Sequence, residues 1–216
     1  GWRLDLGNST INTNLYYMYY QDQMVLTGAL DDVGAPIRET SGESYRLGLE
    51  IDADIRISSL FSTRPNLTLS RNKNIDFRAN LDGEIQNLGE TNISFSPELI
   101  AANQLIYHPT EAFQVNLISK FVGEQYMGNI DSDVSLLDSF FTNDINIVYE
   151  WENPPLFKSV VFTGLINNVF DVKYESNGYF FFFDSQNQAG ETETIEGAGF
   201  YPQAGINFLT GVTLKF

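Results

Sequence analysis

Hydrophobic and polar residues alternate with a period of two along much of this chain. The clearest run is SYRLGLEIDADIRI, residues 44–57. Successive side chains of a β-strand point to opposite faces, so one face of this run is wholly apolar and the other is largely charged. Fourteen residues at about 3.3 Å each span roughly 46 Å, whereas strands in globular proteins usually have about 3 to 10 residues. The run therefore predicts one unusually long amphipathic strand.

Similar alternation, weaker in each case, recurs before and after this run, while helical periodicity is scarce. The additional candidate strands are 2–7, 11–20, 67–70, 99–107, 113–121, 141–151, 160–170 and 207–216. Together with 44–57 they make nine predicted strands. An all-β fold is the expected fold class.

The connections between these strands alternate in length. The short ones are 8–10, 58–65, 109–112 and 153–159, and the long ones are 21–43, 71–98, 123–139 and 171–203. We expect the long connections to be loops without secondary structure, which are uncommon in a compact domain. Short turns on one rim and long loops on the other are typical of an antiparallel transmembrane β-barrel, with apolar faces toward lipid and polar faces toward a lumen.

Aromatic residues near the strand ends fit this barrel prediction. Tyr17, Tyr19, Tyr149 and Trp151 occupy positions expected of interfacial aromatic girdles. A preference of aromatic residues for strands explains them equally well. A soluble β-sandwich module would also show alternating faces, so it remains an alternative at this point.

The odd number of strands has a consequence for the extent of the barrel. Nine strands left open expose two edges, which lipid does not tolerate, and bacterial single-chain barrels have even strand numbers. We therefore expect these residues to be the C-terminal part of a larger barrel.

Composition excludes several classes of function. The formal net charge of −16 opposes binding to nucleic acid. Without cysteine there are no thiolate sites, and the single histidine, His108, precedes a proline in a turn-like stretch. No apolar run approaches the roughly 20 residues of a membrane-spanning helix. We expect no enzyme activity, catalytic residue, metal site or cofactor.

Two segments near the end of the chain carry a family resemblance. INNVFDVKYESNGY, residues 166–179, and FYPQAGINFLTGVTLKF, residues 200–216, resemble the C-terminal end of TonB-dependent outer-membrane receptors. Residues 14–53 and 94–109 look like the same family. The resemblance implies a barrel of 22 strands, of which these nine would be strands 14 to 22. Residues 1–216 would then be the C-terminal part of the barrel domain, with the N-terminal plug domain absent from them.

This resemblance implies active transport at the outer membrane of a Gram-negative cell. The expected cargo is a scarce nutrient such as a siderophore, haem or cobalamin, captured by extracellular loops, with the C-terminus in the periplasm. The expected partners are outer-membrane lipid, the TonB complex through the missing N-terminal region, and an unknown small ligand. The alternatives are a passive or structural barrel, such as a porin or a secretion-associated channel, and a SusC-like glycan importer.

Three sets of residues are the candidate sites. We expect the lumen wall to include Arg46, Glu50, Asp52, Asp54 and Arg56, with the carboxylates pairing with the two arginines. In GYFFFFDS, residues 178–185, a continued strand would put two phenylalanines on each face. These rings either pack on neighbouring loops or, at Phe181 and Phe183, contact a ligand. The loop acids Asp31, Asp32, Asp131 and Asp133 are expected to be solvated, because no EF-hand spacing accompanies them.

The last strand supplies the third set. Phe208, Thr210, Val212, Leu214 and Phe216 alternate with residues that would face the lumen. By resemblance to the family, Phe208, Val212, Leu214 and Phe216 form the signal for the barrel-assembly machinery, a further expected partner. Phe216 would lie at the inner rim of the bilayer.

Overall fold

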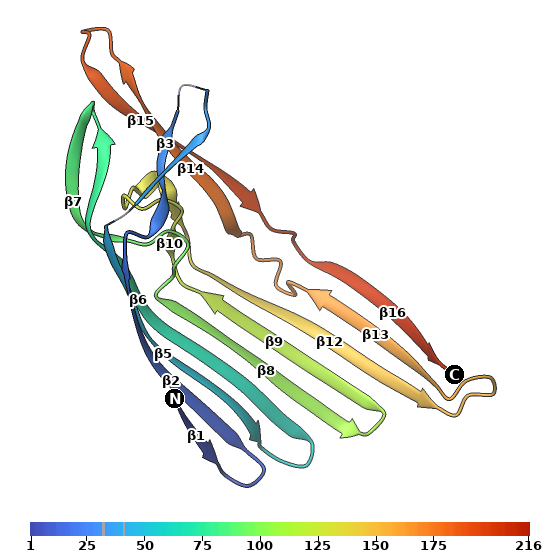
Figure 1. Ribbon diagram of the computed structural model, residues 1–216. Coiled ribbons are helices and arrows are strands. Elements are labelled where there is room, and N and C mark those ends of the chain that lie inside the picture. Colours follow the sequence, from blue (N-terminus) through green and yellow to red (C-terminus); the bar gives the residue numbers. More distant parts are fainter. Residues whose placement is uncertain (32, 41) are drawn as a thin grey trace.

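A wall of nine antiparallel strands forms most of the protein (Figure 1). The computed structural model describes residues 1–31, 33–40 and 42–216. In chain order and in spatial order the wall strands are β1 (Trp2–Asp5), β2 (Thr10–Gln21), β5 (Glu43–Arg56), β6 (Phe61–Leu81), β8 (Leu99–Thr110), β9 (Phe113–Val122), β12 (Phe140–Glu152), β13 (Ser159–Asn167) and β16 (Asn207–Lys215). Each of the nine predicted strands corresponds to a wall strand, and the sheet remains open between β1 and β16. The bounds predicted for β6 are wrong: it extends far beyond residues 67–70 and includes residues 61–65, which were predicted as part of a short connection.

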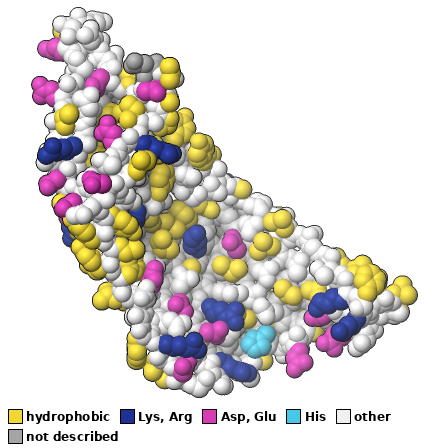
Figure 2. Space-filling model, in the orientation of Figure 1, with side chains coloured by type: hydrophobic (Ala, Val, Ile, Leu, Met, Phe, Trp, Pro, Cys, Tyr) yellow, Lys and Arg dark blue, Asp and Glu magenta, His cyan; other side chains and the backbone are white. Residues whose placement is uncertain are grey.

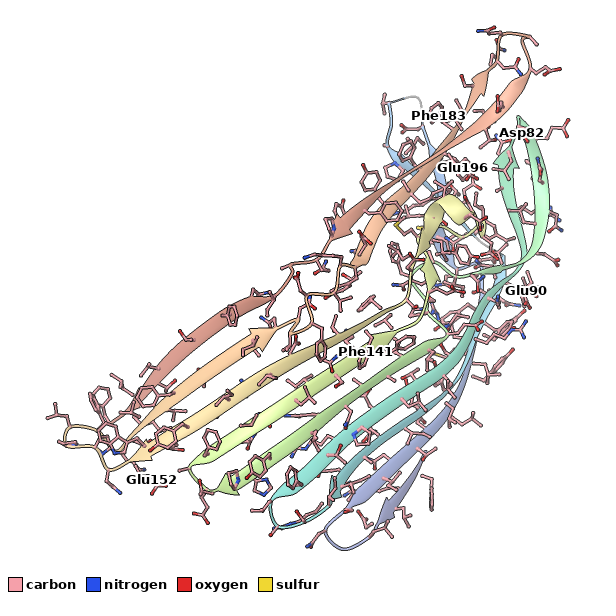
Figure 3. All side chains as sticks on the ribbon, turned by 180° about the vertical axis from the view of Figure 1, so that it is seen from behind. Asp82, Glu90, Phe141, Glu152, Phe183 and Glu196 are labelled. Atoms are coloured by element: carbon pink, nitrogen blue, oxygen red, sulfur yellow. The ribbon has the colours of Figure 1, made fainter. Side chains whose placement is uncertain are left out.

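The pairing register places apolar residues of neighbouring strands on one face of the wall. One row runs through Leu15, Leu49, Leu69 and Leu99. Another runs through Leu105, Leu117, Ile145, Ile166 and Phe208. Directly paired residues of antiparallel strands point to the same side, so the alternation within each strand becomes one continuous apolar face. Phe141 on β12 belongs to this face (Figure 3).

The opposite face of the wall is polar. One of its rows joins Asn12, Asp52 and Asn66, and the next joins Asn14, Glu50 and Thr68. Figure 2 shows charged side chains and the single histidine spread over the wall. The predicted polar face is clearest in β2, β5 and β6, whereas toward the C-terminus this face also carries apolar residues, such as the paired Leu165 and Leu209.

The prediction that the long connections lack secondary structure is wrong. They contain β3 (Met24–Leu30) and β4 (Pro36–Thr40), β7 (Glu84–Asn92) paired with the far end of β6, β10 (Gln125–Tyr126), the 3-10 helix η1 (Asp133–Ser135), β11 (Leu136–Leu137), and β14 (Glu175–Gln186) paired with β15 (Thr192–Pro202). We call residues 21–43, 71–98, 123–139 and 171–203 the hairpin region. At the tip of β6 and β7, Asp82 and Gly83 both have positive φ, as a tight hairpin turn requires.

The hairpins associate with one another. β14 pairs in parallel with β3 through Phe182 and Ala29, which gives a four-stranded sheet in the order β15-β14-β3-β4. Phe77, Ala79 and Phe182 form a buried cluster, against which Val25, Leu88 and Ile130 pack. The hairpin region thus has a hydrophobic core of its own.

Strand β6 runs from the wall into this core, and the positions that lie on its buried side change from even to odd on the way. In the lower part Asn72 and Asn74 are buried, at even positions, whereas beyond Asp76 the buried residues are Phe77 and Ala79, at odd positions. Asp76 has a φ of 53°, and the pairing with β7 shifts register between Asn74 and Phe77. This β-bulge adds one residue, so the odd positions beyond it take the side of the strand that the even positions hold before it.

The C-terminus lies at the rim of the short turns (Figure 1). Phe216 follows the last residue of β16, and its ring centre is 5.1 Å from that of Phe157 in an edge-to-face arrangement. Phe157 belongs to the short turn between β12 and β13. Within the described residues, no helix is long and apolar enough to cross a membrane.

Candidate functional site

The predicted carboxylates lie on the polar face of the wall, and each contacts a neighbouring strand. Asn14 Nδ2 donates to Glu50 at 3.2 Å, and Asn12 Nδ2 donates to Asp52 at 2.8 Å. Arg64 Nε lies 2.9 Å from Asp54. Exposed pairs of this kind contribute little to stability, so the ladder chiefly orients polar groups along the face.

The predicted pairing of these carboxylates with Arg46 and Arg56 is wrong. Arg46 Nη1 donates to Ser96 Oγ at 2.9 Å, and Arg56 Nε donates to the Ser58 carbonyl at 3.4 Å. Residues two apart on one strand are about 7 Å apart, whereas residues paired across strands lie closer. The cross-strand partners are therefore preferred. That these five residues line a lumen stays a prediction.

Hairpin residues fold back across the far end of the polar face. Ser44, at a polar-face position of β5, is buried and donates to Gln23 Oε1 at 2.9 Å. Arg46 is covered there by Ser96. Because these contacts come from polar-face positions, the hairpins cover the far end of that face rather than extending straight from the wall.

Two buried asparagines join several segments of the hairpin region. Asn129 Nδ2 donates to the Leu26 carbonyl at 3.0 Å, and Asn129 Oδ1 accepts from the Ser94 amide at 2.9 Å. Asn74 Nδ2 lies 3.4 Å from the same oxygen, which links β6 to the network. Sequence analysis missed both residues, because asparagine in a predicted loop ordinarily indicates a solvated turn.

The run of four phenylalanines is part of β14, with two rings on each face. Phe182 is buried and Phe180 is partly buried, and both pack toward the hairpin core. Phe181 and Phe183 point the other way and continue a row that starts at Tyr179; Phe183 is labelled in Figure 3. The hypothesis of packing against neighbouring loops thus describes one face only.

The second face of β14 carries a flat row of aromatic rings. The ring centres of Tyr179, Phe181 and Phe183 are 6.3 and 6.4 Å apart, and the ring planes differ by 17° and 8°. Phe183 is 41% exposed. On the paired strand β15, a Cβ on Gly197 would lie 2.5 Å from Cζ of Phe181, and Gly199 similarly makes room for the Tyr179 ring. The glycines let the rings lie flat on the sheet.

An apolar cavity of about 450 Å³ lies beside this row. It is lined by Leu26 and Leu30 of β3, Phe95, Met127 and the 178–181 stretch of β14, and none of the lining residues that the structure describes is Asp, Glu, Lys, Arg or His. Small-molecule sites typically have volumes of about 300–1,000 Å³ and mostly apolar walls.

Hydrogen bonds join the tip of the β6–β7 hairpin to the paired strands β14 and β15; Asp82, at that tip, is labelled in Figure 3. The Asp82 amide donates to Thr194 Oγ1 at 2.7 Å, and the Thr194 amide donates to Asp82 Oδ1 at 2.8 Å. Asp184 accepts from Thr194 Oγ1 at 2.7 Å and from the Gly83 amide at 3.0 Å. Residues separated by about a hundred positions in sequence are thereby held together at the aromatic row's outer end.

Negative charge is concentrated in the hairpin region. It contains 20 of the 28 acidic residues and 5 of the 12 basic residues, so it carries −15 of the net charge of −16.

Asp171, just beyond β13, accepts from the Ile206 amide and contacts Lys173 Nζ, each at 2.9 Å. These two contacts lower the pKa of Asp171 below its ordinary value. Burial raises the pKa of Tyr126.

Several acidic residues of the connections have structural contacts. Asp131 accepts from the Asn92 amide at 2.8 Å, and Asp31 accepts from the Ala35 amide at 2.8 Å. Asp32 lies outside the described residues. Within the described part of the chain, no group of three or more His, Asp or Glu residues is arranged to hold a metal ion.

Comparisons with solved structures identify the fold. The ferric-catecholate import receptor Fiu of E. coli K12 in its closed form matches with a TM-score of 0.63 and 16% identity, over 100% of this chain and 26% of Fiu. The ferric yersiniabactin uptake receptor FyuA of Yersinia pestis matches with a TM-score of 0.61 and 16% identity, over 99% of this chain and 29% of FyuA. The copper transporter OprC matches with a TM-score of 0.65 and 17% identity, over 97% of this chain and 28% of OprC.

These three proteins are TonB-dependent outer-membrane receptors, and they are transport proteins rather than enzymes. The chain therefore has the fold of a barrel segment of that class, as the resemblance in the sequence predicted. It spans between a quarter and a third of the length of these receptors. No family model and no curated protein matches the sequence.

Proposed function

We propose that these 216 residues belong to the C-terminal barrel of a TonB-dependent outer-membrane receptor that imports a scarce small nutrient, such as a siderophore, haem or cobalamin. The observation that supports this most strongly is the combined fold. A nine-strand wall with one apolar face continues into folded hairpins, and the whole arrangement matches receptor barrels over nearly all of its length. A simple pore would not need hairpins with a core and a cavity of their own.

The proposal assigns a role to each part of the molecule. The apolar face of the wall would contact lipid, and Arg46, Glu50, Asp52, Asp54 and Arg56 would line the lumen. The hairpin region would be extracellular and the short turns and C-terminus periplasmic. A plug domain and a segment that contacts the TonB complex would come from the part of the protein outside these residues.

The exposed aromatic row is the proposed point of ligand contact. The rings of Tyr179, Phe181 and Phe183 are nearly parallel, and the first two line the cavity. Aromatic faces bind apolar and planar groups with little loss of side-chain entropy. Substrate would be held there and by the hairpins before it passes down the polar face.

Growth of a strain lacking the gene tests this function. We expect the deletion to lower growth on one limiting source among ferric siderophores, haem, cobalamin and glycans, and the full-length gene to restore it. Loss of TonB should produce the same defect, because an energy-coupled receptor is inactive without it. A passive barrel would be insensitive to TonB. Equal growth of deletion and parent strains on every source would contradict a role in import.

A further inference from the structure

The walls of the apolar cavity are held by buried groups. Its Leu26 wall is fixed by Asn129, which is buried and donates to the Leu26 carbonyl at 3.0 Å. A Cβ on Gly128 would lie 2.6 Å from Cδ1 of Phe180, and one on Gly28 would lie 2.8 Å from Cε1 of Phe182. Backbone and rings therefore meet too closely for either wall to move inward without displacing the core. The cavity is a preformed feature of the hairpin core.

The chemistry of the cavity contrasts with its surroundings. Its described lining consists of Leu, Pro, Met, Phe, Tyr and Gly residues, among which the Tyr179 hydroxyl is the one ionisable group. The hairpin region around it carries a net charge of −15. A charged ligand group entering the cavity would lose its hydration without gaining an ion partner. An anionic group would in addition be repelled by the surrounding carboxylates.

From this contrast we propose that the cavity binds an uncharged, apolar ring system and discriminates against anionic ligands. The inference rests on the proposed import function and narrows its substrate class to ligands that present a neutral aromatic or alicyclic group. Tyr179 and Phe181 line the cavity, and Phe183, the next ring of the row, would bind the part of such a ligand that remains outside it. Selection would come from the cost of burying charge and from repulsion of anions, with no specific ion pair.

Two fluorescent probes that share one arylamine skeleton test the charge preference. N-phenyl-1-naphthylamine is neutral, and 1-anilinonaphthalene-8-sulfonate adds a single negative charge. We expect the full-length receptor in neutral detergent to bind the neutral probe saturably, and at least about tenfold more tightly than the sulfonate. Empty micelles give the background signal. Equal affinity for the two probes, or no saturable binding of the neutral probe, would overturn the proposal.

A matched pair of variants places the probe. Leu26→Glu puts a carboxylate at the cavity wall and should weaken binding of the neutral probe by about tenfold or more. Leu156→Glu makes the same change in an exposed short turn at the opposite rim and should leave binding unchanged. Unchanged binding in Leu26→Glu would also overturn the proposal. Far-ultraviolet circular dichroism and the Leu26→Lys variant, which should instead favour the sulfonate, separate a charge effect from misfolding.

The outcomes distinguish the two proposals. If the deletion strain has an import defect but Leu26→Glu binds the neutral probe normally, the cavity assignment is wrong and the transport function remains. If the probes behave as expected but no nutrient source reveals a defect, the cavity assignment remains and import is wrong.

Discussion

The wall and the hairpin region are both made of β-strands, yet they place their apolar side chains in opposite ways. In the wall, apolar residues form an exposed face; Leu15 is 71% and Phe208 is 68% exposed. In the hairpin region, Phe77 and Phe182 are each 2% exposed and form a core. Charge differs as well, at about −1 for the wall and −15 for the hairpin region. The wall is suited to an apolar solvent, whereas the hairpins fold as a protein does in water.

Removing core volume from the hairpins should separate the two regions most strongly. Phe182→Ala deletes a buried ring and should destabilise the hairpin core by about 3–5 kcal/mol. Limited proteolysis of the assembled barrel should then show cleavage in the hairpin region while the wall remains protected. Phe183→Ala, on the exposed face of the same strand, is the control. Equal protection of the two variants would mean that the hairpins do not depend on this core.

Adjacent residues of β9 sharpen the comparison within the wall. Leu117→Arg puts a charge on the apolar face and should cost about 2–4 kcal/mol near the middle of a bilayer. Ile118→Arg puts the same charge on the polar face, next to Gln104 and Asp144, where it should cost far less. Urea unfolding of the barrel in lipid vesicles measures the difference. Similar losses in the two variants would contradict a lipid-facing apolar side.

Deletion of Phe216 tests the end of the wall. We expect a several-fold lower amount of assembled receptor in the outer membrane, measured by immunoblot of membrane fractions. The ring contact with Phe157 is worth only about 0.5–1.5 kcal/mol. Phe157→Leu should therefore leave assembly nearly normal if Phe216 acts as an assembly signal. Equal losses in both variants would assign Phe216 a packing role.

The double variant Phe181→Ser and Phe183→Ser tests the exposed side of the hairpin region. It should weaken nutrient uptake by about fivefold or more without lowering the amount of assembled barrel. Ile195→Ser changes the aliphatic neighbour paired with Phe183 and should have a smaller effect on uptake. Normal uptake in the double variant would remove these rings from the site.

Acid should loosen the junction between the regions slightly. The lowered pKa of Asp171 means that its stabilising contacts are complete above the ordinary aspartate pKa and are lost as pH falls through the lower folded value. Amide exchange at Ile206 should therefore accelerate below about pH 4. Asp171→Asn should make this exchange less dependent on pH. An exchange profile identical to that of the parent would show that another group controls the junction.

The wall was predictable because its solvent imposes a simple rule. Most wall strands alternate about one lipid-compatible side, most clearly in residues 44–57, so the number of strands follows from the sequence. The cross-strand partners of the wall residues do not follow from the sequence. Asp54 pairs with Arg64 rather than with Arg56 because pairing depends on register, which a single sequence does not reveal.

The hairpin region was poorly predicted for a different physical reason. Both faces of β14 are at least partly covered, so its four phenylalanines show no alternation of apolar and polar residues. The cavity and the asparagines Asn74 and Asn129 depend on contacts among segments far apart in sequence. A local pattern contains no signal for them. Only the separation of the four rings into two pairs on opposite faces of β14 followed from a period of two.

The bulge at Asp76 shifts the alternation of β6 by one residue. Before it, the buried positions are even and belong to the wall; beyond it, they are odd and belong to the hairpin core. A regular strand with the same residues and no bulge would place Asp76, Arg78 and Asn80 on the side where Asn74 is buried. Phe77 and Ala79 would then point away from the hairpin core.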